Sequence, residues 1–180
     1  MNGVVSLLDD EHYQQVEALW AELSERFGLR GVYITPFPHF SYQVAPHYDT
    51  QQLEPLLRQA ASTMTPFQIK TTGLGIFTGA QPVLYIPVVR SLALSQTHQM
   101  LWQAISHAGQ GILDYYAPEN WMPHITIGFG DLQPDLLPEV TRLLVTRDFT
   151  WKMTINHFAF IDNSGIQQQL LFQCAFSAPS

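Results

Sequence analysis

The sequence predicts an α+β fold in which antiparallel or mixed sheets, flanked by helices, form two lobes related by a pseudo-twofold axis. Helical segments and strand pairs suited to hairpins are mixed along the 180 residues, which argues against a doubly wound parallel sheet. The segment 38–42, Pro-His-Phe-Ser-Tyr, returns in similar form as Pro-His-Ile-Thr-Ile at 123–127. We therefore expect residues 1–180 to form a single bilobal domain with two internally similar halves.

The surroundings of the two motifs repeat as well. Each motif is followed, 10 or 11 residues after its histidine, by an aspartate that opens a helical stretch, Asp49 or Asp135. Beyond those stretches, the segments 67–70 and 149–152 both begin with phenylalanine and end with lysine, at an offset of 82 residues. A period near 83 that occurs only twice does not suit a solenoid, so it indicates an internal duplication.

In the first half, the sequence predicts a strand, a helix, two strands and a second helix, over residues 4–8, about 10–27, 31–35, 39–44 and about 50–63. Asp9 and Asp10 are suitable N-terminal caps for the first helix, and Gly28 is a suitable stop. Prolines at 36 and 38 separate the two strands. Pro55 belongs in the first turn of the second helix or marks a late start of it.

In the second half, the sequence predicts two strands, a helix, a strand, a helix and a long hairpin, over residues 67–77, 84–89, 91–107, 124–129, 135–145, 149–161 and 166–176. The segment 91–107 is strongly amphipathic at helical spacing. Turn residues at 79–82 join the first two strands. The run Asp-Asn-Ser-Gly at 162–165 is typical of the turn of a hairpin.

Composition limits the classes of partner. Fifteen acidic residues against eight basic ones give a formal charge of −7, and no basic stripe is present, so we expect no long nucleic acid as a ligand. The single cysteine, Cys174, excludes an internal disulfide and fits a cytoplasmic protein. No apolar stretch approaches the roughly 18 residues that span a bilayer, and no signal peptide is recognisable. The sequence gives no indication of the oligomeric state.

The two motifs place chemically active side chains on one face of each strand. Because side chains alternate along a strand, His39 shares a face with Ser41, and His124 shares a face with Thr126. If the strands lie side by side, one cleft receives two imidazoles and two hydroxyls, a set suited to acid–base chemistry on a phosphate. A His-x-Ser/Thr pattern arises by chance about once in such a chain, so the interpretation depends on the repeated surroundings.

Two aromatic residues near the second motif are further candidates for substrate binding. Trp121, three residues before His124, either forms a wall on which a base stacks or is an aromatic packed in its loop. Phe129 faces the site only if Gly128 bulges, because strict alternation turns it away from His124. No His/Cys/Asp/Glu set has metal-ligand spacing and no cofactor motif is present, so we expect neither a metal nor a cofactor.

On these residues the sequence resembles the 2H phosphoesterases, which include the RNA 2′,3′-cyclic phosphodiesterases, often labelled 2′-5′ RNA ligases, and the plant and yeast cyclic phosphodiesterases. His39 and Ser41 match the first His-x-Thr/Ser motif of that family, and His124 and Thr126 match the second. The run 124–131 is similar to the cyclic phosphodiesterase branch, where an aromatic residue and a Gly-Asp pair follow the motif. No Arg or Lys follows the second motif, unlike in many bacterial RNA-processing members, which argues against long RNA substrates.

The resemblance implies a bilobal α+β fold and a metal-independent hydrolysis of a 2′,3′-cyclic phosphate on a small nucleotide or an RNA end. It implies His124 as the base toward water and His39 as the acid toward the leaving oxygen, and the symmetry of the two motifs leaves the reversed assignment open. Ser41 and Thr126 would donate hydrogen bonds to the non-bridging oxygens. Three alternatives remain at this point: 2′-5′ ligation by the reverse reaction, a nucleotide-binding module without turnover, and a plain interaction domain.

Overall fold

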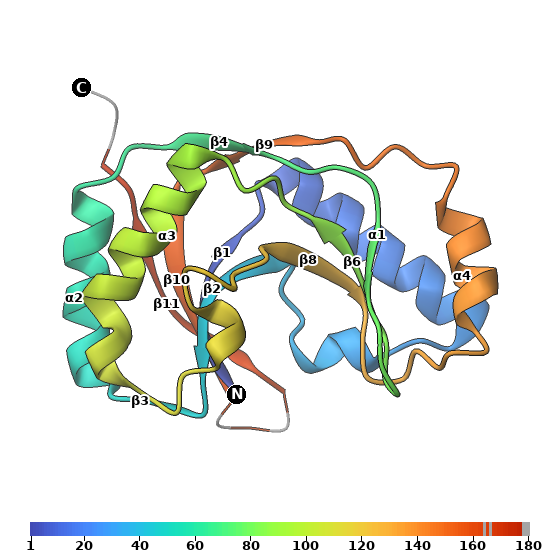
Figure 1. Ribbon diagram of the computed structural model, residues 1–180, viewed down its shortest axis with the longest axis horizontal. Coiled ribbons are helices and arrows are strands. Elements are labelled where there is room, and N and C mark those ends of the chain that lie inside the picture. The colour runs from blue at the N-terminus through green and yellow to red at the C-terminus, as the bar shows by residue number, and fades with distance from the viewer. Residues whose placement is uncertain (164, 166, 178–180) are drawn as a thin grey trace.

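The computed structural model describes residues 1–163, 165 and 167–177, and it has the predicted α+β class with antiparallel strand pairs (Figure 1). The larger sheet has the strand order β11-β10-β1-β2 and a second sheet the order β5-β6-β8. Two short strand pairs, β3-β7 and β4-β9, complete the described strands. No helix in this described part of the chain is long and apolar enough to cross a membrane.

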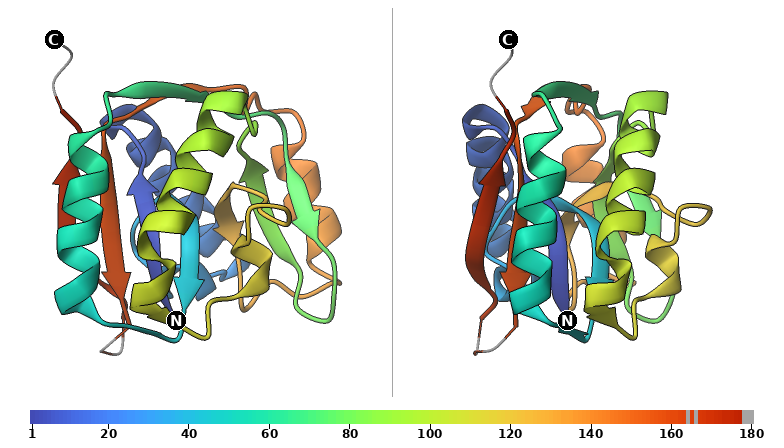
Figure 2. Two further views of the ribbon diagram at one scale, coloured as in Figure 1. Left: turned by 60° about the vertical axis from the view of Figure 1, so that its left-hand side comes forward. Right: turned by 90° about the vertical axis from the view of Figure 1, so that its left-hand side faces the viewer.

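The larger sheet and its helices form one side of the molecule. Its strands are β1 (Asn2–Leu7), β2 (His39–Ala45), β10 (His157–Asp162) and β11 (Gln169–Ala175). Helices α2 (Thr50–Ser62) and α3 (Leu92–Ile105) cover one face of this sheet (Figure 2). The short strands β3 (His47–Tyr48) and β7 (Gly109–Gln110) pair beside them.

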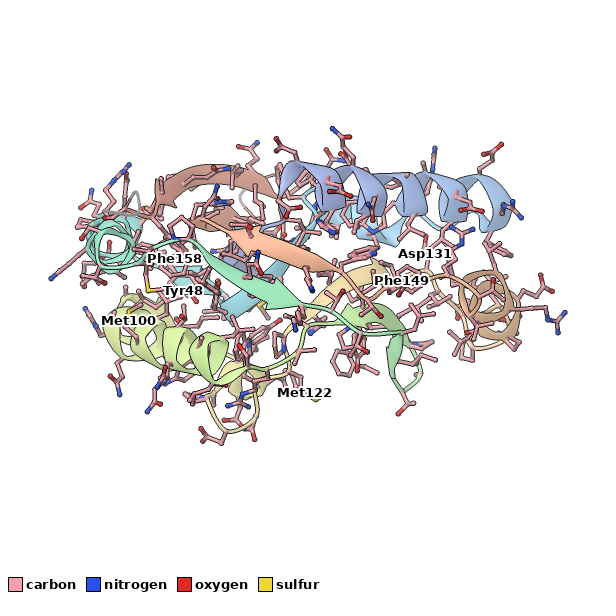
Figure 3. All side chains as sticks on the ribbon, turned by 90° about the horizontal axis from the view of Figure 1, so that it is seen from above. Tyr48, Met100, Met122, Asp131, Phe149 and Phe158 are labelled. Carbon is pink, nitrogen blue, oxygen red and sulfur yellow. The ribbon has the colours of Figure 1, made fainter. Side chains whose placement is uncertain are left out.

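The other side of the molecule contains the second sheet. Its strands are β5 (Gly75–Phe77), β6 (Val83–Pro87) and β8 (His124–Gly128), and its helices are α1 (Asp10–Phe27) and α4 (Leu137–Leu144). The strands β4 (Phe67–Lys70) and β9 (Lys152–Ile155) pair antiparallel across the top of the molecule and link the two sides (Figures 1 and 3). Three short 3-10 helices cover Gly31–Ile34, Ser106–Ala108 and Asp114–Tyr116.

Each motif strand packs against a helix that precedes the other motif in the sequence. α1, which precedes the first motif, packs against β8 of the second motif, whereas α3, which precedes the second motif, packs against β2 of the first. Leu19, Leu23 and Leu101 are among the buried side chains of these helices. Because each motif strand is supported by the helix that precedes the other motif, neither side can move independently without opening the shared apolar core.

The first helix begins and ends as its sequence predicts. The Asp9 carboxylate accepts a hydrogen bond from the His12 backbone N–H, 3.2 Å away, as an N-terminal cap. At the other end Gly28 has a φ of 72°, and its N–H donates to the backbone of the last turn. Glycine adopts this left-handed conformation without the steric penalty that a side chain would bring.

The segment predicted as a strand at 31–35 is a 3-10 helix over Gly31–Ile34, so that prediction is wrong. The carboxylate of Asp131 accepts hydrogen bonds from the backbone N–H groups of Arg30 and Gly31, at 2.5 and 2.8 Å, and bends the chain here. The turn also needs glycine, because a Cβ at position 31 would lie only 1.8 Å from the carbonyl oxygen of Phe129. This contact across about 100 residues overrides the local strand pattern.

Two long predicted strands are each divided in the structure. The predicted strand 67–77 becomes β4 and β5, and the predicted strand 149–161 becomes β9 and β10, with the members of each pair in different sheets. Asn156 separates β9 from β10. Parts of the predicted hairpin turn at 162–165 and the first residue of the predicted strand 166–176 lie outside the described residues, and the last strand runs over Gln169–Ala175.

The second helix starts earlier than Pro55 suggested. Asp49 caps α2 by accepting hydrogen bonds from the N–H groups of Gln51 and Gln52, so the helix begins at Thr50. Pro55 therefore lies inside the helix, beyond its first turn, where its ring removes one backbone donor.

Candidate active site

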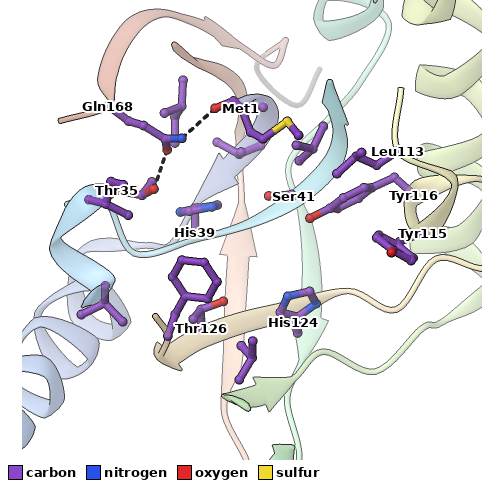
Figure 4. A pocket seen from close by; sticks show the side chains of 18 of the residues that line it. Met1, Thr35, His39, Ser41, Leu113, Tyr115, Tyr116, His124, Thr126 and Gln168 are labelled. Atoms are coloured by element: carbon purple, nitrogen blue, oxygen red, sulfur yellow. Dashed lines mark hydrogen bonds between the residues drawn. The ribbon is translucent and has the colours of Figure 1, made fainter. Parts of the chain in front are cut away.

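The two motif strands face each other across a cleft. β2 is an edge strand of the larger sheet and β8 is an edge strand of the second sheet, and the two approach each other without forming a ladder. The cleft between them has a volume of about 840 Å³. His39, Ser41, His124 and Thr126 all line it (Figure 4). The structure therefore brings the four motif side chains into one space.

Both imidazoles are held in the same way. The Nδ1 of His39 lies 2.5 Å from the carbonyl oxygen of Phe37, and the Nδ1 of His124 lies 2.7 Å from that of Met122, in each case two residues earlier. A carbonyl only accepts hydrogen bonds, so each Nδ1 carries the proton. In the neutral ring, Nε2 is therefore the unprotonated nitrogen, and it can take up a proton or, once protonated, give one.

Aromatic rings surround the second histidine. The ring of Phe77 lies edge-on to His124 with the centroids 4.9 Å apart, and Tyr85 lies 5.2 Å from the same imidazole. Phe77 and Tyr85 stack on each other at 4.2 Å. Neither ring stands out in the sequence. Their pairing in the β5–β6 hairpin, next to β8, becomes apparent only from the strand order.

Burial disfavours the charged form of both imidazoles. The pKa of His39 is lowered to about 4, mainly by desolvation; the bond to the Phe37 carbonyl opposes this change and the neighbouring His124 adds to it. Desolvation also lowers the pKa of His124, which the Met122 carbonyl partly offsets. Near neutral pH the free protein thus holds two neutral imidazoles whose Nε2 atoms can accept protons.

A tyrosine adds a third hydroxyl beside Ser41. Tyr116, in the 3-10 helix Asp114–Tyr116, lines the cleft with its phenol directed at Ser41 (Figure 4). Burial raises the pKa of this phenol, so it stays protonated and can donate a hydrogen bond. The adjacent Tyr115 also lines the cleft but is 76% exposed. The sequence offered no pattern that would distinguish these tyrosines from ordinary loop residues.

The two motif strands carry the same irregularity. In β2, Tyr42 is an extra residue, because Ser41 pairs with Val5 while Gln43 pairs with Val4. In β8, Ile127 is the extra residue between the partners of Tyr85 and Leu84. Each bulge thus follows the hydroxyl residue of its motif directly.

The bulge in β8 explains the position of Phe129. The extra residue at Ile127 shifts the alternation by one, so that the third residue after Thr126 returns to the cleft side. Phe129 accordingly lines the cleft and is 44% exposed. The sequence predicts that this orientation needs a bulge at Gly128, and the structure has the extra residue one position earlier, at Ile127.

Trp121 lies in the core, not in the cleft, so the prediction that a base stacks on it is wrong and its alternative, a packed loop aromatic, describes it. The side chain is 1% exposed and stacks on His98, with ring centroids 3.8 Å apart. Its Nε1–H donates to the carbonyl oxygen of Ser41 at 2.9 Å. A ring enclosed in this way has no face left for a ligand.

A second tryptophan makes the matching bond to the other motif. The Nε1–H of Trp20, in α1, donates to the carbonyl oxygen of Thr126 at 3.1 Å. Arg90 adds support on the other side, because its guanidinium donates to the carbonyl oxygens of Trp121 and Pro118 and so fixes the loop before His124. Among the described residues, no three His, Cys, Asp or Glu side chains gather closely enough to hold a metal ion.

Comparison with known proteins places this fold. The family model of the 2′-5′ RNA ligase superfamily matches residues 8–167. TT0787 of Thermus thermophilus is 15% identical, with a TM-score of 0.70 over 99% of both chains. E. coli LigT complexed with ATP is 15% identical, with a TM-score of 0.60 over 98% of this chain and 97% of that one. E. coli LigT complexed with 3′-AMP is 12% identical, with a TM-score of 0.57 over the same shares.

A comparison with curated protein sequences found no match. At 15% identity or less, the likeness to the solved structures shows a shared fold. The family model, by contrast, covers most of the chain and includes both histidine motifs. The chain therefore belongs to the 2′-5′ RNA ligase superfamily, a group of 2H phosphoesterases.

Proposed function

We propose that this protein is a metal-independent phosphoesterase that opens a 2′,3′-cyclic phosphate, with His39 and His124 as the acid–base pair. One observation carries the proposal: two imidazoles enter one cleft, each with Nδ1 bonded to a backbone carbonyl and Nε2 left for proton transfer. A structural histidine buried in a strand has no need of such a partner across the cleft. This arrangement suits a reaction that needs a base on one side of phosphorus and an acid on the other.

In the proposed reaction, a water oxygen attacks phosphorus in line with the departing ribose oxygen. Nε2 of His124 takes the proton from that water, the bond from phosphorus to the ribose oxygen breaks, and Nε2 of His39 gives its proton to that oxygen. The product is a nucleoside monophosphate ester with a free neighbouring hydroxyl. This assignment of roles follows the family resemblance. When the 5′-hydroxyl of a second nucleotide takes the place of water, the same attack breaks the bond from phosphorus to the 3′ oxygen and leaves a 2′-5′ linkage.

The lowered pKa values determine when His39 acquires its proton. In the free protein, burial lowers the pKa of His39 to about 4, so its Nε2 is unprotonated near neutral pH. A phosphodiester anion in the cleft favours the charged form of a nearby imidazole and raises its pKa. Substrate binding thereby favours the uptake, from solvent, of the proton that the acid must carry, and the burial of the site makes the pairing of charges strong.

Hydroxyl groups would stabilise the charge that develops on the non-bridging oxygens. Ser41 and Thr126 line the cleft two residues after the histidines, on the same strand faces, and Tyr116 lies beside Ser41. The main chains of Ser41 and Thr126 are fixed by the hydrogen bonds from Trp121 and Trp20. Donors held in place before the reaction need no reorganisation during it, which is the main source of this kind of stabilisation.

Two further proposals rest on this site. The matching bulges and the matching indole bonds support an internal duplication in which each half contributes one histidine. The structures of LigT complexed with ATP and with 3′-AMP support a nucleotide as the substrate class.

We also propose a cytoplasmic location, because a chain with one buried cysteine fits a reducing compartment.

The test is incubation of the purified protein with a panel of 2′,3′-cyclic mononucleotides, ADP-ribose cyclic phosphate and 2′-5′ oligonucleotides. We expect hydrolysis of a 2′,3′-cyclic phosphate to a single monophosphate regioisomer, with the same rate in the presence of a chelator. The exposed His107 lies outside the cleft, so His107→Ala is the matched control for His39→Ala in excluding a contaminating hydrolase. Binding of nucleotide without any product would instead support the binding-module alternative.

A further inference from the structure

The lining of the cleft carries no charged side chain among the described residues. Besides the two imidazoles, its polar groups are hydroxyls and carboxamides, such as those of Thr35, Thr78, Asn120 and Gln168. Hydroxyls and amides can donate to one phosphate, but they do not neutralise it. Apart from the N-terminal amino group of Met1, the only positive charge that a described lining residue can bring to a substrate is therefore a protonated imidazole, of which the reaction needs one.

The charged side chains next along the chain to the lining residues are acidic. Asp114 lies between the lining residues Leu113 and Tyr115, and Asp162 lies between Ile161 and Asn163. Glu119 directly precedes the lining residue Asn120. The whole chain has a formal charge of −7. A second negative group on the substrate would therefore meet repulsion and no neutralising partner among the described lining side chains.

Apolar side chains gather at the same cleft. Of the ten large hydrophobic side chains that are exposed among the described residues, five line it: Met1, Ile34, Tyr115, Met122 and Phe129. Met122 is 58% exposed although it directly precedes the Pro-His pair of the second motif. Exposed apolar groups that cluster in a concave site mark a surface that a ligand covers. Here they favour flat or apolar, uncharged groups beside the phosphate.

We propose that the preferred substrate carries a single negative charge, on the reacting phosphodiester, and that the other groups of the substrate are uncharged. This inference rests on the proposed function and names its substrate class: nucleoside 2′,3′-cyclic phosphates with a free 5′-hydroxyl, in preference to the same compounds with a further phosphate. One imidazolium balances one phosphodiester anion. A further phosphate has to leave water for a site that offers it no cationic side chain, and burying an unpaired charge is costly.

The test compares adenosine 2′,3′-cyclic phosphate with its 5′-phosphorylated counterpart at one ionic strength. We expect kcat/KM to be at least about tenfold higher for the 5′-hydroxyl compound, which corresponds to a 1.4 kcal/mol difference in transition-state binding. The dissociation constants of both compounds are measured in parallel by calorimetry and are expected to show the same preference. Equal kcat/KM values, or a preference for the 5′-phosphorylated compound, would overturn the inference.

Lysine variants show whether the preference comes from the cleft. Thr78→Lys and Ile34→Lys each place a cation at an exposed lining position from a different segment. Gln59→Lys, on the exposed face of α2 outside the cleft, adds the same charge elsewhere. We expect at least one cleft variant to reduce the preference about tenfold and the Gln59→Lys control to leave it unchanged. An equal effect of the control would contradict a local origin.

The outcomes separate this inference from the proposed function. If both compounds are hydrolysed at equal rates, the proposed function stands and the charge preference fails. If neither is hydrolysed but the 5′-hydroxyl compound binds at least tenfold more tightly, the charge preference stands and the proposed function fails. Binding of neither compound would overturn both.

Discussion

The indole Nε1–H of Trp121 donates to the carbonyl oxygen of Ser41 over 2.9 Å, and this bond connects the loop before one histidine motif to the strand of the other. Trp20 makes the counterpart bond to Thr126. In both cases a buried tryptophan satisfies the carbonyl of the residue that precedes a bulge. The two bonds thus help to keep the hydroxyl residues directed into the cleft, although the strands β2 and β8 do not pair with each other.

Trp121→Phe should weaken both stability and turnover. The substitution leaves the Ser41 carbonyl buried without its donor, which costs about 1–3 kcal/mol of unfolding free energy. We expect kcat to fall about tenfold with KM little changed, because Trp121 positions the strand and does not touch the substrate. Urea unfolding and steady-state kinetics measure the two effects. Trp151→Phe, remote from the cleft, is the control, and an unchanged kcat in Trp121→Phe would contradict a positioning role.

Tyr116→Phe should lower kcat by about one to two orders of magnitude, since it removes one donor to the developing negative charge. The ring is kept, so the packing and the free energy of unfolding should change little. The neighbouring Tyr115→Phe is the matched control, because this tyrosine also lines the cleft but is 76% exposed. Equal kinetic effects in the two variants would show that the Tyr116 hydroxyl has no special role.

The pH dependence of kcat/KM should have its maximum on the acid side of pH 6.5. The reaction needs one protonated and one neutral imidazole, and burial lowers the pKa of both, that of His39 to about 4. The singly protonated free protein is therefore most populated below 6.5, and the two limbs belong to the coupled pair. The kcat profile should lie at higher pH, because the bound anion raises both pKa values.

Rates measured between about pH 4 and 9 at constant ionic strength test this pair of profiles. A kcat/KM maximum above pH 7 would mean that the free imidazoles are not desolvated as described. Coincident kcat and kcat/KM profiles would mean that the bound phosphate does not interact with them.

His98 should make the protein less stable in mild acid. Burial lowers the pKa of this imidazole to about 4, whereas an unfolded chain has it near 6.5. Between these values the unfolded state binds more protons, so the stabilising effect is full above pH 6.5 and declines as the pH falls toward 4. The loss amounts to about 3 kcal/mol for a shift of this size.

His98→Gln tests that dependence, because an amide can still donate to the Tyr42 carbonyl, which the Nε2 of His98 contacts at 2.9 Å, but does not titrate. The free energy of unfolding, measured by urea at pH 7 and pH 4.5, should fall less in the variant than in the wild type. His39 contributes in the same direction in both proteins, so the difference between them isolates His98. An identical fall in both would refute the assignment.

The mixture of helical and hairpin patterns was sufficient to predict the α+β class, and the repeated motifs were sufficient to predict the strands that carry His39 and His124. Local signals were also sufficient for α1, where Asp9 and Gly28 mark both ends. These features depend on residues that are close together in the sequence. For the same reason the spacing within each motif was enough to assign its histidine and its hydroxyl residue to one strand face.

The rest depends on contacts between distant segments. The segment at Gly31 has the sequence pattern of a strand, but its backbone is bent by a hydrogen bond to the Asp131 carboxylate, 100 residues later. Trp121 is a candidate stacking surface from the sequence alone, but in the structure His98 stacks on its ring. Phe129 faces the cleft only because of the bulge at Ile127, which no local pattern specifies. Sequence periodicity reports the face of a regular element and carries no information on such partners.

Turnover by the two single histidine variants tests the central claim most directly. On a 2′,3′-cyclic nucleotide, His39→Ala and His124→Ala should each lose roughly 10² to 10⁴ in kcat. The double variant should lose far less than the product of these factors, because the two residues act as a unit. When sulfur replaces the leaving ribose oxygen, no acid is needed, so His39→Ala should recover most of its activity and His124→Ala should not. Near-normal turnover of the natural oxygen substrate by either single variant would contradict the two-histidine mechanism.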